Sequence, residues 1–133
     1  MKLMVCLDER GGMAFNGRRQ SRDRRVCEDM VREVGKACLA VRPESAALFS
    51  ESAVELLVCA DPMREAGECD ACFLETQKPI LREDTDTVVI YRWNRHYPAD
   101  LTFDADLSAF RMTRHEEFAG TSHENITKEV WKR

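Results

Sequence analysis

The sequence lacks long hydrophobic runs, an excess of positive charge and the length for two ordinary domains. The apolar run that opens the chain, Leu3 to Leu7, ends at Asp8 and is too short for a signal-peptide core or a membrane span. The net charge of −4 gives the chain as a whole no attraction for duplex nucleic acid or an anionic membrane. A chain of 133 residues supports one core. We therefore expect a single cytoplasmic domain, 1–133, without a membrane segment, in which any anion site is local.

The sequence contains six cysteines, which are either reduced thiols or parts of disulfides. Cys6, Cys38 and Cys59 each lie inside an apolar run, where a thiol acts as a small hydrophobic group, so we expect them to be reduced core residues. Cys69 and Cys72 form one C-x-x-C pair that runs into a predicted strand. A zinc site needs further ligands and a redox motif normally opens a helix, so we expect no metal at this pair.

The first half of the chain predicts alternating strands and helices. KLMVCL (2–7) is apolar almost throughout, which is typical of a central strand buried on both faces. The segment 22–36 has apolar residues at helical spacing and predicts a helix capped by Ser21 and closed at Gly35. ACLAV (37–41) follows as a strand, and strand, helix and strand in this order imply a right-handed crossover with parallel strands.

The rest of the chain predicts shorter elements and an antiparallel end. We expect, in order, a short helix at 42–50, a strand at 54–60, a helical turn at 61–68, a strand at 70–75, a short helix at 76–84 capped by Thr76, a strand at 85–93 and a hairpin of the segments 109–118 and 124–133. The predicted fold is a three-layer α/β domain with a mostly parallel central sheet and a C-terminal antiparallel hairpin. The longest loops, 8–20 and 94–106, are candidates for function.

The order of elements resembles the dihydrofolate reductase fold. In that family an apolar first strand leads into a mobile glycine-containing loop and then a helix with an acidic residue in its first turn; KLMVCL, GGMAFNG and the helix containing Asp23 are similar. The strand VVIYRW, the acidic loop ADLTFDADLSAF and the closing ITKEVWKR resemble the end of the family's chain. The resemblance implies that Asp23 binds a ligand and that Asn16 and Gly17 belong to the mobile loop.

The resemblance also raises the question of NADPH. Members of the family carry a glycine pair after a late strand, where the backbone approaches the NADPH pyrophosphate, but the segment after DACFLE reads TQKP here. The family's Pro-Trp pair before the first helix is replaced by RRQS. NADPH is therefore a possible cofactor that these residues do not favour, and an NADPH-dependent reductase is the alternative function.

The two ends of the chain resemble small bacterial proteins of which some are labelled ribonuclease Z. The similar segments are DERGGMAFNGRRQSRDR and TSHENITKEVW. Ribonuclease Z itself is a zinc hydrolase with an H-x-H-x-D-H cluster. The three histidines here, His96, His115 and His123, form no such cluster, so the sequence does not predict its metal chemistry.

The first loop holds the strongest candidates for ligand binding. Arginines gather just before the first helix, where free backbone N–H groups and the helix dipole already favour an anion. Arg18 and Arg19 precede the helix and lack acidic neighbours at helical spacing, so they are preferred as ligands of a phosphate or carboxylate; a solvated helix face is the alternative. Asp8 and Arg10 lie at the carboxyl end of the first strand, where ligands bind in open α/β sheets. Asp8 alternatively caps the turn into Gly11.

The second loop adds aromatic candidates. RWNRHYP contains Trp93, Asn94 and Tyr97, a combination suited to stacking on a planar ring and donating to its phosphate, although both rings alternatively pack beneath the loop. Ser122 lies next to His123 in TSHEN, but adjacent residues seldom point at one another, so we expect a turn there rather than a nucleophile and its base.

These candidates predict a small-molecule-binding domain, whether an enzyme or a binding module, for a nucleotide-like or other anionic ligand. The ligand-binding set is Asp8, Arg10, Asn16, Arg18, Arg19, Asp23, Trp93, Asn94 and Tyr97. The alternatives are the NADPH-dependent reductase and a protein or RNA interaction module that uses the arginines. The latter predicts salt-sensitive binding to a polymer.

Overall fold

The computed structural model describes all residues, 1–133. Its ten strands form two sheets, and helices and single helical turns connect some of the strands. The elements are β1 (Lys2–Leu7), β2 (Gly12–Phe15), β3 (Arg18–Arg19), α1 (Arg24–Val34), β4 (Cys38–Val41), α2 (Pro43–Ala46), η1 (Ala47–Phe49), β5 (Glu55–Val58), α3 (Pro62–Glu65), η2 (Gly67–Cys69), β6 (Ala71–Leu74), β7 (Thr87–Arg92), β8 (Leu101–Thr102), β9 (Arg111–Phe118) and β10 (Ile126–Lys132). None of the helices is both long and apolar enough to cross a bilayer.

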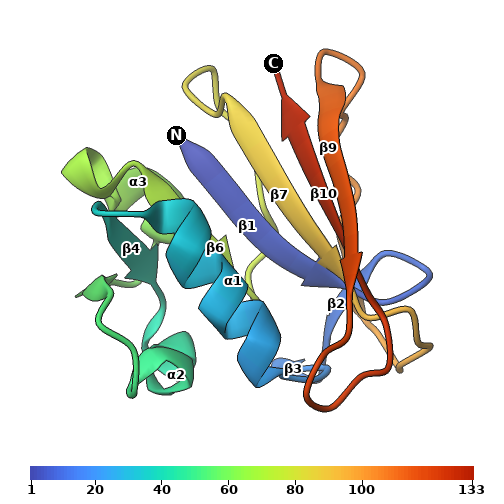
Figure 1. The fold of residues 1–133 in the computed structure, drawn as a ribbon. Coiled ribbons are helices and arrows are strands. Elements are labelled where there is room, and N and C mark those ends of the chain that lie inside the picture. Colours follow the sequence, from blue (N-terminus) through green and yellow to red (C-terminus); the bar gives the residue numbers. More distant parts are fainter.

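The main sheet has seven strands in the order β5-β4-β6-β1-β7-β10-β9, with β1 in the middle (Figure 1). The strands from β5 to β7 are parallel to their neighbours, whereas β10 pairs antiparallel with both β7 and β9. The predicted central strand, parallel crossover and C-terminal hairpin are therefore confirmed. β6 lies between β1 and β4, so the first crossover passes over one strand position.

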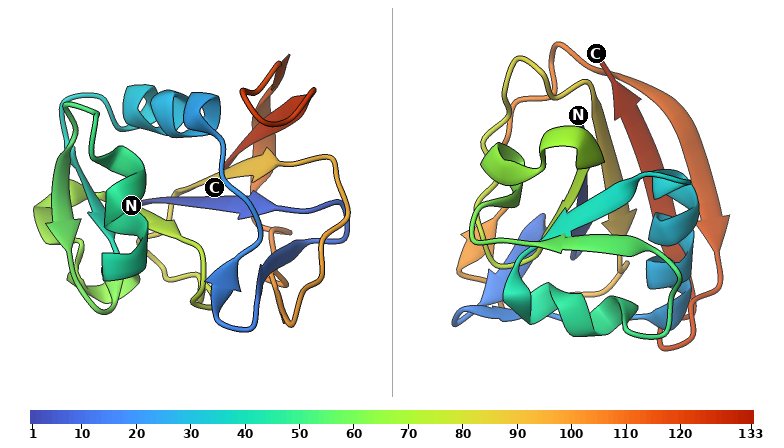
Figure 2. Two further views of the ribbon diagram at one scale, coloured as in Figure 1. Left: turned by 90° about the horizontal axis from the view of Figure 1, so that it is seen from below. Right: turned by 90° about the vertical axis from the view of Figure 1, so that its left-hand side faces the viewer.

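Successive side chains of the central strands point to opposite faces of the main sheet, and each face has its own core. Leu3, Val5 and Leu7 of β1 point to one face, and Met4 points to the other. One core packs under α1 and α2, and the other under α3, the β2 strand and the loop that carries Phe110. Figure 2 (left) shows α1 on one side of β1 and the β2–β3 hairpin on the other. The chain thus forms the predicted three layers, with a thin layer on the α3 side.

Helix α1 is the only long helix, and its sequence explains its position. Val26, Met30 and Val34 recur at helical spacing and are buried against the sheet. Gly35 ends the helix with φ of 67°, a conformation that favours glycine, and its N–H donates to Val31 O. The N-cap is Asp23 rather than the predicted Ser21, since the Asp23 carboxylate accepts from Arg25 N and the helix begins at Arg24.

A buried lysine fixes the exposed side of α1 to the C-terminal strands. Lys128 of β10 has a side chain that is only 3% exposed, and its Nζ lies 2.6 Å from Asp29 Oδ2 and also pairs with Glu33. Arg114 of β9 pairs with the same Glu33 carboxylate at 2.9 Å. Burial alone raises the pKa of Glu33, but the hydrogen bonds and charges of Lys128 and Arg114 outweigh it and lower this pKa to about 2.

Stability is therefore expected to depend on Glu33 in acid. The folded-state pKa lies below the ordinary value of 4.5, so the stabilisation is complete above that value and is lost as the pH falls towards 2. Over this range the free energy of unfolding of the wild type should fall by on the order of 2 kcal/mol more than that of Glu33→Gln. Urea unfolding at a series of pH values measures this difference in the free energy of unfolding. Parallel pH curves for the two proteins would contradict the prediction.

Two segments differ from the sequence prediction because of local backbone chemistry. Residues 76–84 form an irregular segment, with a bend at 76–77 and a turn at 83–84, rather than a helix, since Pro79 lacks an N–H donor and disfavours a helical residue before it. The loop 8–20 contains the hairpin β2–β3, in which Asn16 and Gly17 have φ of 56° and 73°. Positive φ at both positions is the signature of a two-residue hairpin turn. The loop 94–106 contributes β8, which pairs with β2.

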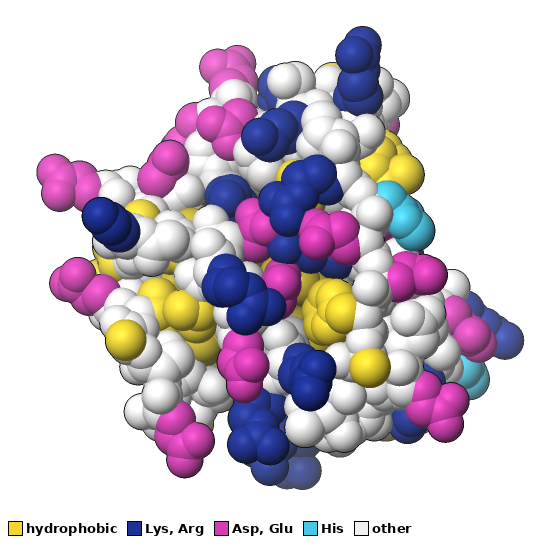
Figure 3. Space-filling model, in the orientation of Figure 1, with side chains coloured by type: hydrophobic (Ala, Val, Ile, Leu, Met, Phe, Trp, Pro, Cys, Tyr) yellow, Lys and Arg dark blue, Asp and Glu magenta, His cyan; other side chains and the backbone are white.

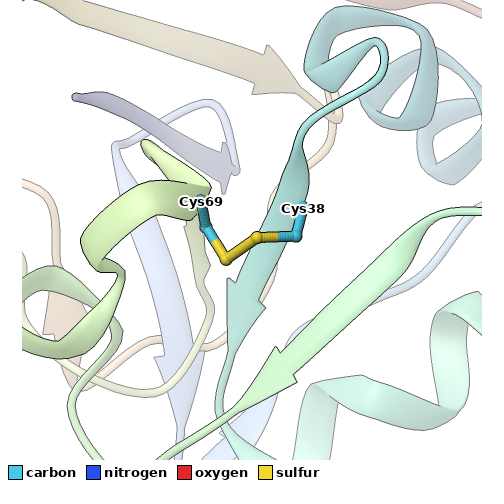
Figure 4. Close-up of a disulfide and its surroundings, with 2 residues drawn as sticks. All are labelled: Cys38 and Cys69. Atoms are coloured by element: carbon cyan, nitrogen blue, oxygen red, sulfur yellow. A yellow bond between two sulfur atoms is a disulfide. The ribbon is translucent and has the colours of Figure 1, made fainter.

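The prediction that Cys38 is a reduced core residue is wrong. Cys38 at the start of β4 forms a disulfide with Cys69 of η2, at a sequence separation of 31 (Figure 4). Cys69 thus pairs with β4 and not with its C-x-x-C neighbour Cys72, which is a buried free thiol. Disulfides persist mainly in oxidising compartments, so the cysteines no longer favour a cytoplasmic location, which stays a prediction.

Candidate functional site

The most connected polar cluster of the molecule surrounds His123, in the turn between β9 and β10. The His123 ring is buried at the N-terminal end of α1. Its Nδ1 lies 3.1 Å from Asp23 Oδ2. Its Nε2 lies 3.1 Å from both Ser21 Oγ and Tyr97 OH. A neutral ring that donates from Nδ1 to the carboxylate leaves Nε2 free to accept from a hydroxyl.

The Asp23 carboxylate is held by backbone donors as well as by the imidazole. Oδ1 accepts from Arg25 N at 2.9 Å and from Thr121 N at 3.0 Å, and Oδ2 accepts from Ser122 N at 2.8 Å. Burial by itself raises the pKa of this carboxyl, but the hydrogen bonds outweigh it and hold the pKa far below its ordinary value. Asp23 is therefore an ionised group within the fold, and Gly120 is required beside it because a Cβ there would clash with the carboxylate.

Aromatic rings fix the imidazole in place. Trp93 stacks on His123 with ring centroids 4.5 Å apart and an interplanar angle of 21°. Tyr97 meets the same ring edge-on at a centroid distance of 6.5 Å. Three of the residues proposed from the sequence, Asp23, Trp93 and Tyr97, thus converge on a histidine that the sequence analysis assigned only to a turn.

Asp8 caps the turn that leads into Gly11 and Gly12, which is the alternative to ligand binding. Its Oδ1 accepts from Gly12 N at 2.7 Å and from Arg10 N at 2.8 Å. Its Oδ2 accepts from Gln20 Nε2 at 3.0 Å and lies 3.4 Å from Tyr97 N. Burial raises the pKa of Asp8, but these hydrogen bonds outweigh it and lower the pKa. With both oxygens occupied by the protein, Asp8 positions the Tyr97 loop.

The other predicted ligands do not face His123. Arg10 is exposed at the first turn, and Asn16 lies at the exposed tip of the β2–β3 hairpin, where its N–H donates to Asp100 Oδ2 at 3.1 Å. Asn94 donates from Nδ2 to Asn125 O at 3.1 Å and to Thr127 Oγ1 at 2.9 Å, which ties its loop to the start of β10.

Arg18 and Arg19 have different surroundings although they are adjacent. Arg18 is exposed. Arg19 donates from Nε and Nη2 to the two oxygens of Glu75, each at 2.9 Å, and the Glu75 side chain is only 5% exposed. Ser45 Oγ donates to the same carboxylate at 2.7 Å. Arg19 has no acidic partner close by in the sequence, and its partner Glu75 comes from the residue after β6, far away in the sequence.

This difference predicts unequal effects of two adjacent substitutions. Arg19→Ala leaves a buried carboxylate without its guanidinium and is expected to lower the free energy of unfolding by about 2 kcal/mol. Arg18→Ala removes only exposed charge and should change it by less than about 0.5 kcal/mol. Urea unfolding of both variants tests the pair, and equal effects would show that the Arg19–Glu75 bridge does not stabilise the fold.

A cleft of about 670 Å³ opens beside the Asp23 cluster, between the N-terminal half of α1 and the segment that follows α2. It is lined by Arg22, Asp23, Arg24, Cys27, Glu28, Ala47, Leu48, Phe49, Ser50, Glu51, Ser52, Thr121 and Ser122. Arg22 and Arg24 are exposed, and the acidic Glu28 and Glu51 share the cleft with them. Figure 3 shows Lys and Arg side chains gathered at the lower edge of this face, where the N-terminal end of α1 lies in Figure 1.

A second, smaller cleft lies on the α3 side, with a volume of about 290 Å³. Arg64, Lys78 and Arg82 line it together with the apolar Met63, and the neighbouring Ile80 is 75% exposed. The structure contains no group of three or more His, Cys, Asp or Glu side chains placed to hold a metal ion.

The fold is that of dihydrofolate reductase. The structure matches dihydrofolate reductase from Enterococcus faecalis, complexed with NADP(H) and RAB-propyl, with a TM-score of 0.67, over 99% of this chain and 95% of that chain. The two sequences are only 9% identical, so the likeness shows the fold. No protein-family model matches the sequence, and no curated protein is significantly similar to it.

The residues at the end of β6 do not fit a bound NADPH. In the family a glycine pair lets the backbone approach the pyrophosphate, whereas Glu75 follows Leu74 here with a buried carboxylate. Thr76 Oγ1 donates to Glu44 Oε1 at 2.6 Å, and Arg42 Nε donates to the same oxygen at 2.7 Å. Side chains with protein partners, Glu75 with Arg19 and Thr76 with Glu44, thus follow β6 in place of the glycine pair.

Proposed function

We propose that the chain is a small-molecule-binding domain whose anionic ligand occupies the cleft between α1 and the segment 47–52. The observation that carries the proposal is the pair of exposed guanidinium groups, Arg22 and Arg24, that line a cleft of about 670 Å³ at the N-terminal end of α1. Guanidinium groups bind carboxylates and phosphates through two parallel hydrogen bonds. The positive end of the helix dipole adds to the same preference.

The position of the cleft supports the proposal. Ser21 and Asp23 follow the loop from the carboxyl end of β1, and Trp93 follows the carboxyl end of β7; open α/β sheets bind their ligands at this edge. The matched reductase was solved as a complex with NADP(H) and RAB-propyl, so the same fold accommodates small ligands in that protein. A nucleotide-like or other phosphate-bearing compound is the ligand class that we propose for this chain.

The anion ligands that we propose are Arg22 and Arg24, a few residues after Arg18 and Arg19. Arg19 is already paired with Glu75, so Arg22 and Arg24 take the role first given to Arg18 and Arg19. Thr121 and Ser122 bring hydroxyl groups to the same cleft. Asp23 is not proposed as a ligand of the anion, because its carboxylate already accepts hydrogen bonds from Thr121, Ser122 and the His123 ring.

A thermal-shift screen against nucleotides, sugar phosphates, folates and NADPH tests the proposal. A compound at 100 times its Kd stabilises the native state by about 2.7 kcal/mol, which raises the Tm of a domain of this size by roughly 10 °C. The shift should be lost in Arg22→Ala/Arg24→Ala and kept in the matched control Arg64→Ala/Arg82→Ala, which alters the smaller cleft.

The other outcomes contradict the proposal in different ways. A shift lost only in the control variant places the ligand in the smaller cleft. A rise in Tm with NADPH or a folate alone supports the reductase, although the buried Glu75 does not fit a bound NADPH. If no compound shifts the Tm but RNA binds with a steep salt dependence, the exposed arginines belong to an interaction module.

A further inference from the structure

Three side chains from distant parts of the chain are arranged as a nucleophile, a base and an orienting carboxylate. Ser21 Oγ lies 3.1 Å from His123 Nε2, and His123 Nδ1 lies 3.1 Å from Asp23 Oδ2. Ser21 and His123 are separated by 102 residues in the sequence, so only the fold brings them together. The first distance is within the range over which a serine hydroxyl passes its proton to an imidazole, and the second is within hydrogen-bond range of a carboxylate that orients the ring.

We propose that Ser21 is the nucleophile of an acyl-transfer site that hydrolyses small carboxylic esters. Ser21 Oγ attacks the ester carbonyl carbon, and its proton passes to His123 Nε2. The bond to the leaving alkoxide oxygen breaks, and this oxygen takes the proton from Nε2. Water then attacks the acyl-serine by the same route, which releases the carboxylic acid and restores the hydroxyl of Ser21.

The surroundings hold the imidazole in the orientation that this step needs. The ring stacks on Trp93, and Asp23 is itself fixed by the backbone N–H groups of Thr121 and Ser122. A carboxylate that accepts from Nδ1 sets the tautomer that leaves Nε2 as the base, and it stabilises the imidazolium as it forms. Asp23 is thus a positioning residue, and His123 is the residue that exchanges the proton.

Access and charge also favour Ser21. Ser21 is partly exposed, whereas His123 and Asp23 are buried, so the hydroxyl is the member of the three that a substrate reaches. The next residue, Arg22, lines the large cleft, and α1 begins at Arg24. Developing negative charge on the carbonyl oxygen is stabilised by a nearby guanidinium and by the N-terminal end of a helix.

Tyr97 is the competing hydroxyl, because its OH lies at the same distance from His123 Nε2 as Ser21 Oγ. A phenol close to Nε2 takes part of the hydrogen bonding that Ser21 needs for activation. Tyr97→Phe removes the competitor and keeps the ring that meets His123 edge-on. This variant should react at Ser21 faster than the wild type, because His123 Nε2 then accepts from Ser21 alone.

The test is covalent labelling of the intact protein with diisopropyl fluorophosphate, read by mass spectrometry of the whole chain and of its peptides. A single adduct on Ser21 is expected, which forms as the Ser21 Oγ–P bond replaces the P–F bond. It should be absent in Ser21→Ala and present in the matched serine control Ser108→Ala, which lies in an exposed loop. Wild-type protein that takes no adduct at millimolar reagent, or takes it at Tyr97, overturns the proposal.

Hydrolysis of p-nitrophenyl acetate supplies the second measurement. Ser21→Ala and His123→Gln should lower kcat by about 100-fold or more, with a native circular-dichroism spectrum confirming the fold of each variant. Asp23→Asn should lower kcat by a comparable factor with KM changed by less than about threefold, which a purely structural loss would not produce. Ser21→Ala that hydrolyses the ester as fast as the wild type overturns the proposal, and the labelling result decides it if a His123 or Asp23 variant does not fold.

Discussion

Replacement of Asp23 by alanine is expected to lower the free energy of unfolding by about 4 kcal/mol. The substitution removes the N-cap of α1, which contributes roughly 1 kcal/mol. It also removes the acceptor of the N–H groups of Thr121 and Ser122, whose hydrogen bonds are partly buried and contribute about 0.5–1.5 kcal/mol each. His123 loses its partner at Nδ1 in the same variant.

Urea unfolding at neutral pH measures this effect. Asp100→Ala is the matched control, because Asp100 also accepts a backbone N–H, that of Asn16, but lies on the surface. It should change the free energy of unfolding by less than about 0.5 kcal/mol. A change of less than about 1 kcal/mol in Asp23→Ala would show that the His123 turn does not depend on the carboxylate.

Loss of the Cys38–Cys69 bridge is expected to have the second-largest effect. The bridge closes a loop with a sequence separation of 31, for which the chain-entropy relation gives roughly 3–4 kcal/mol. The bridge joins the start of β4 to η2, immediately before β6, and so keeps two neighbouring strands of the main sheet in place. Cys38→Ala/Cys69→Ala should lower the Tm by about 10 °C or more.

Thiol titration provides the control for this prediction. The unfolded protein, never exposed to a reductant, should show four reactive thiols, those of Cys6, Cys27, Cys59 and Cys72. Calorimetry of Cys59→Ala, which removes a thiol without breaking the bridge, should show a much smaller fall in Tm than that of the double variant. Six reactive thiols, or equal Tm values in the double variant and the wild type, would contradict the expectation.

The sequence predicted the elements whose pattern is local and repetitive. The continuous apolar run of 3–7 identifies a central strand buried on both faces, and the spacing of Val26 and Met30 identifies α1. Such patterns depend only on which side chains a strand or helix must bury. The fold class could be stated from these patterns, and the resemblance to dihydrofolate reductase was carried by the order of elements and by motifs such as KLMVCL and GGMAFNG; both are confirmed.

The site was harder to predict because its members are far apart in the chain. Nothing near His123 in the sequence indicates Ser21 or Asp23, which the fold brings from the other end of the chain. The Arg19–Glu75 pair was missed for the same reason, since only the position of β6 beside β1 brings Glu75 near the first loop. An apolar neighbourhood is equally compatible with a free thiol and a buried bridge, so Cys38 gave no signal of its partner.

Asp23 shows how a family resemblance and a residue's surroundings can disagree. The resemblance implies a carboxylate that binds a ligand from the first turn of the helix. In this chain the turn 120–123 covers that carboxylate, and its oxygens accept from Thr121, Ser122 and the His123 ring. The contacts of Asp23 in this chain are therefore those of a supporting group.

Amide chemical-shift mapping of the isotope-labelled protein with a phosphate-bearing ligand from the screen locates the ligand on the protein. We predict that the largest shifts fall on Arg22, Arg24, Ser50, Thr121 and Ser122, which line the cleft beside α1. Shifts confined to the smaller cleft, at Arg64, Gln77 and Lys78, would contradict the claim and place the ligand on the opposite side of the sheet.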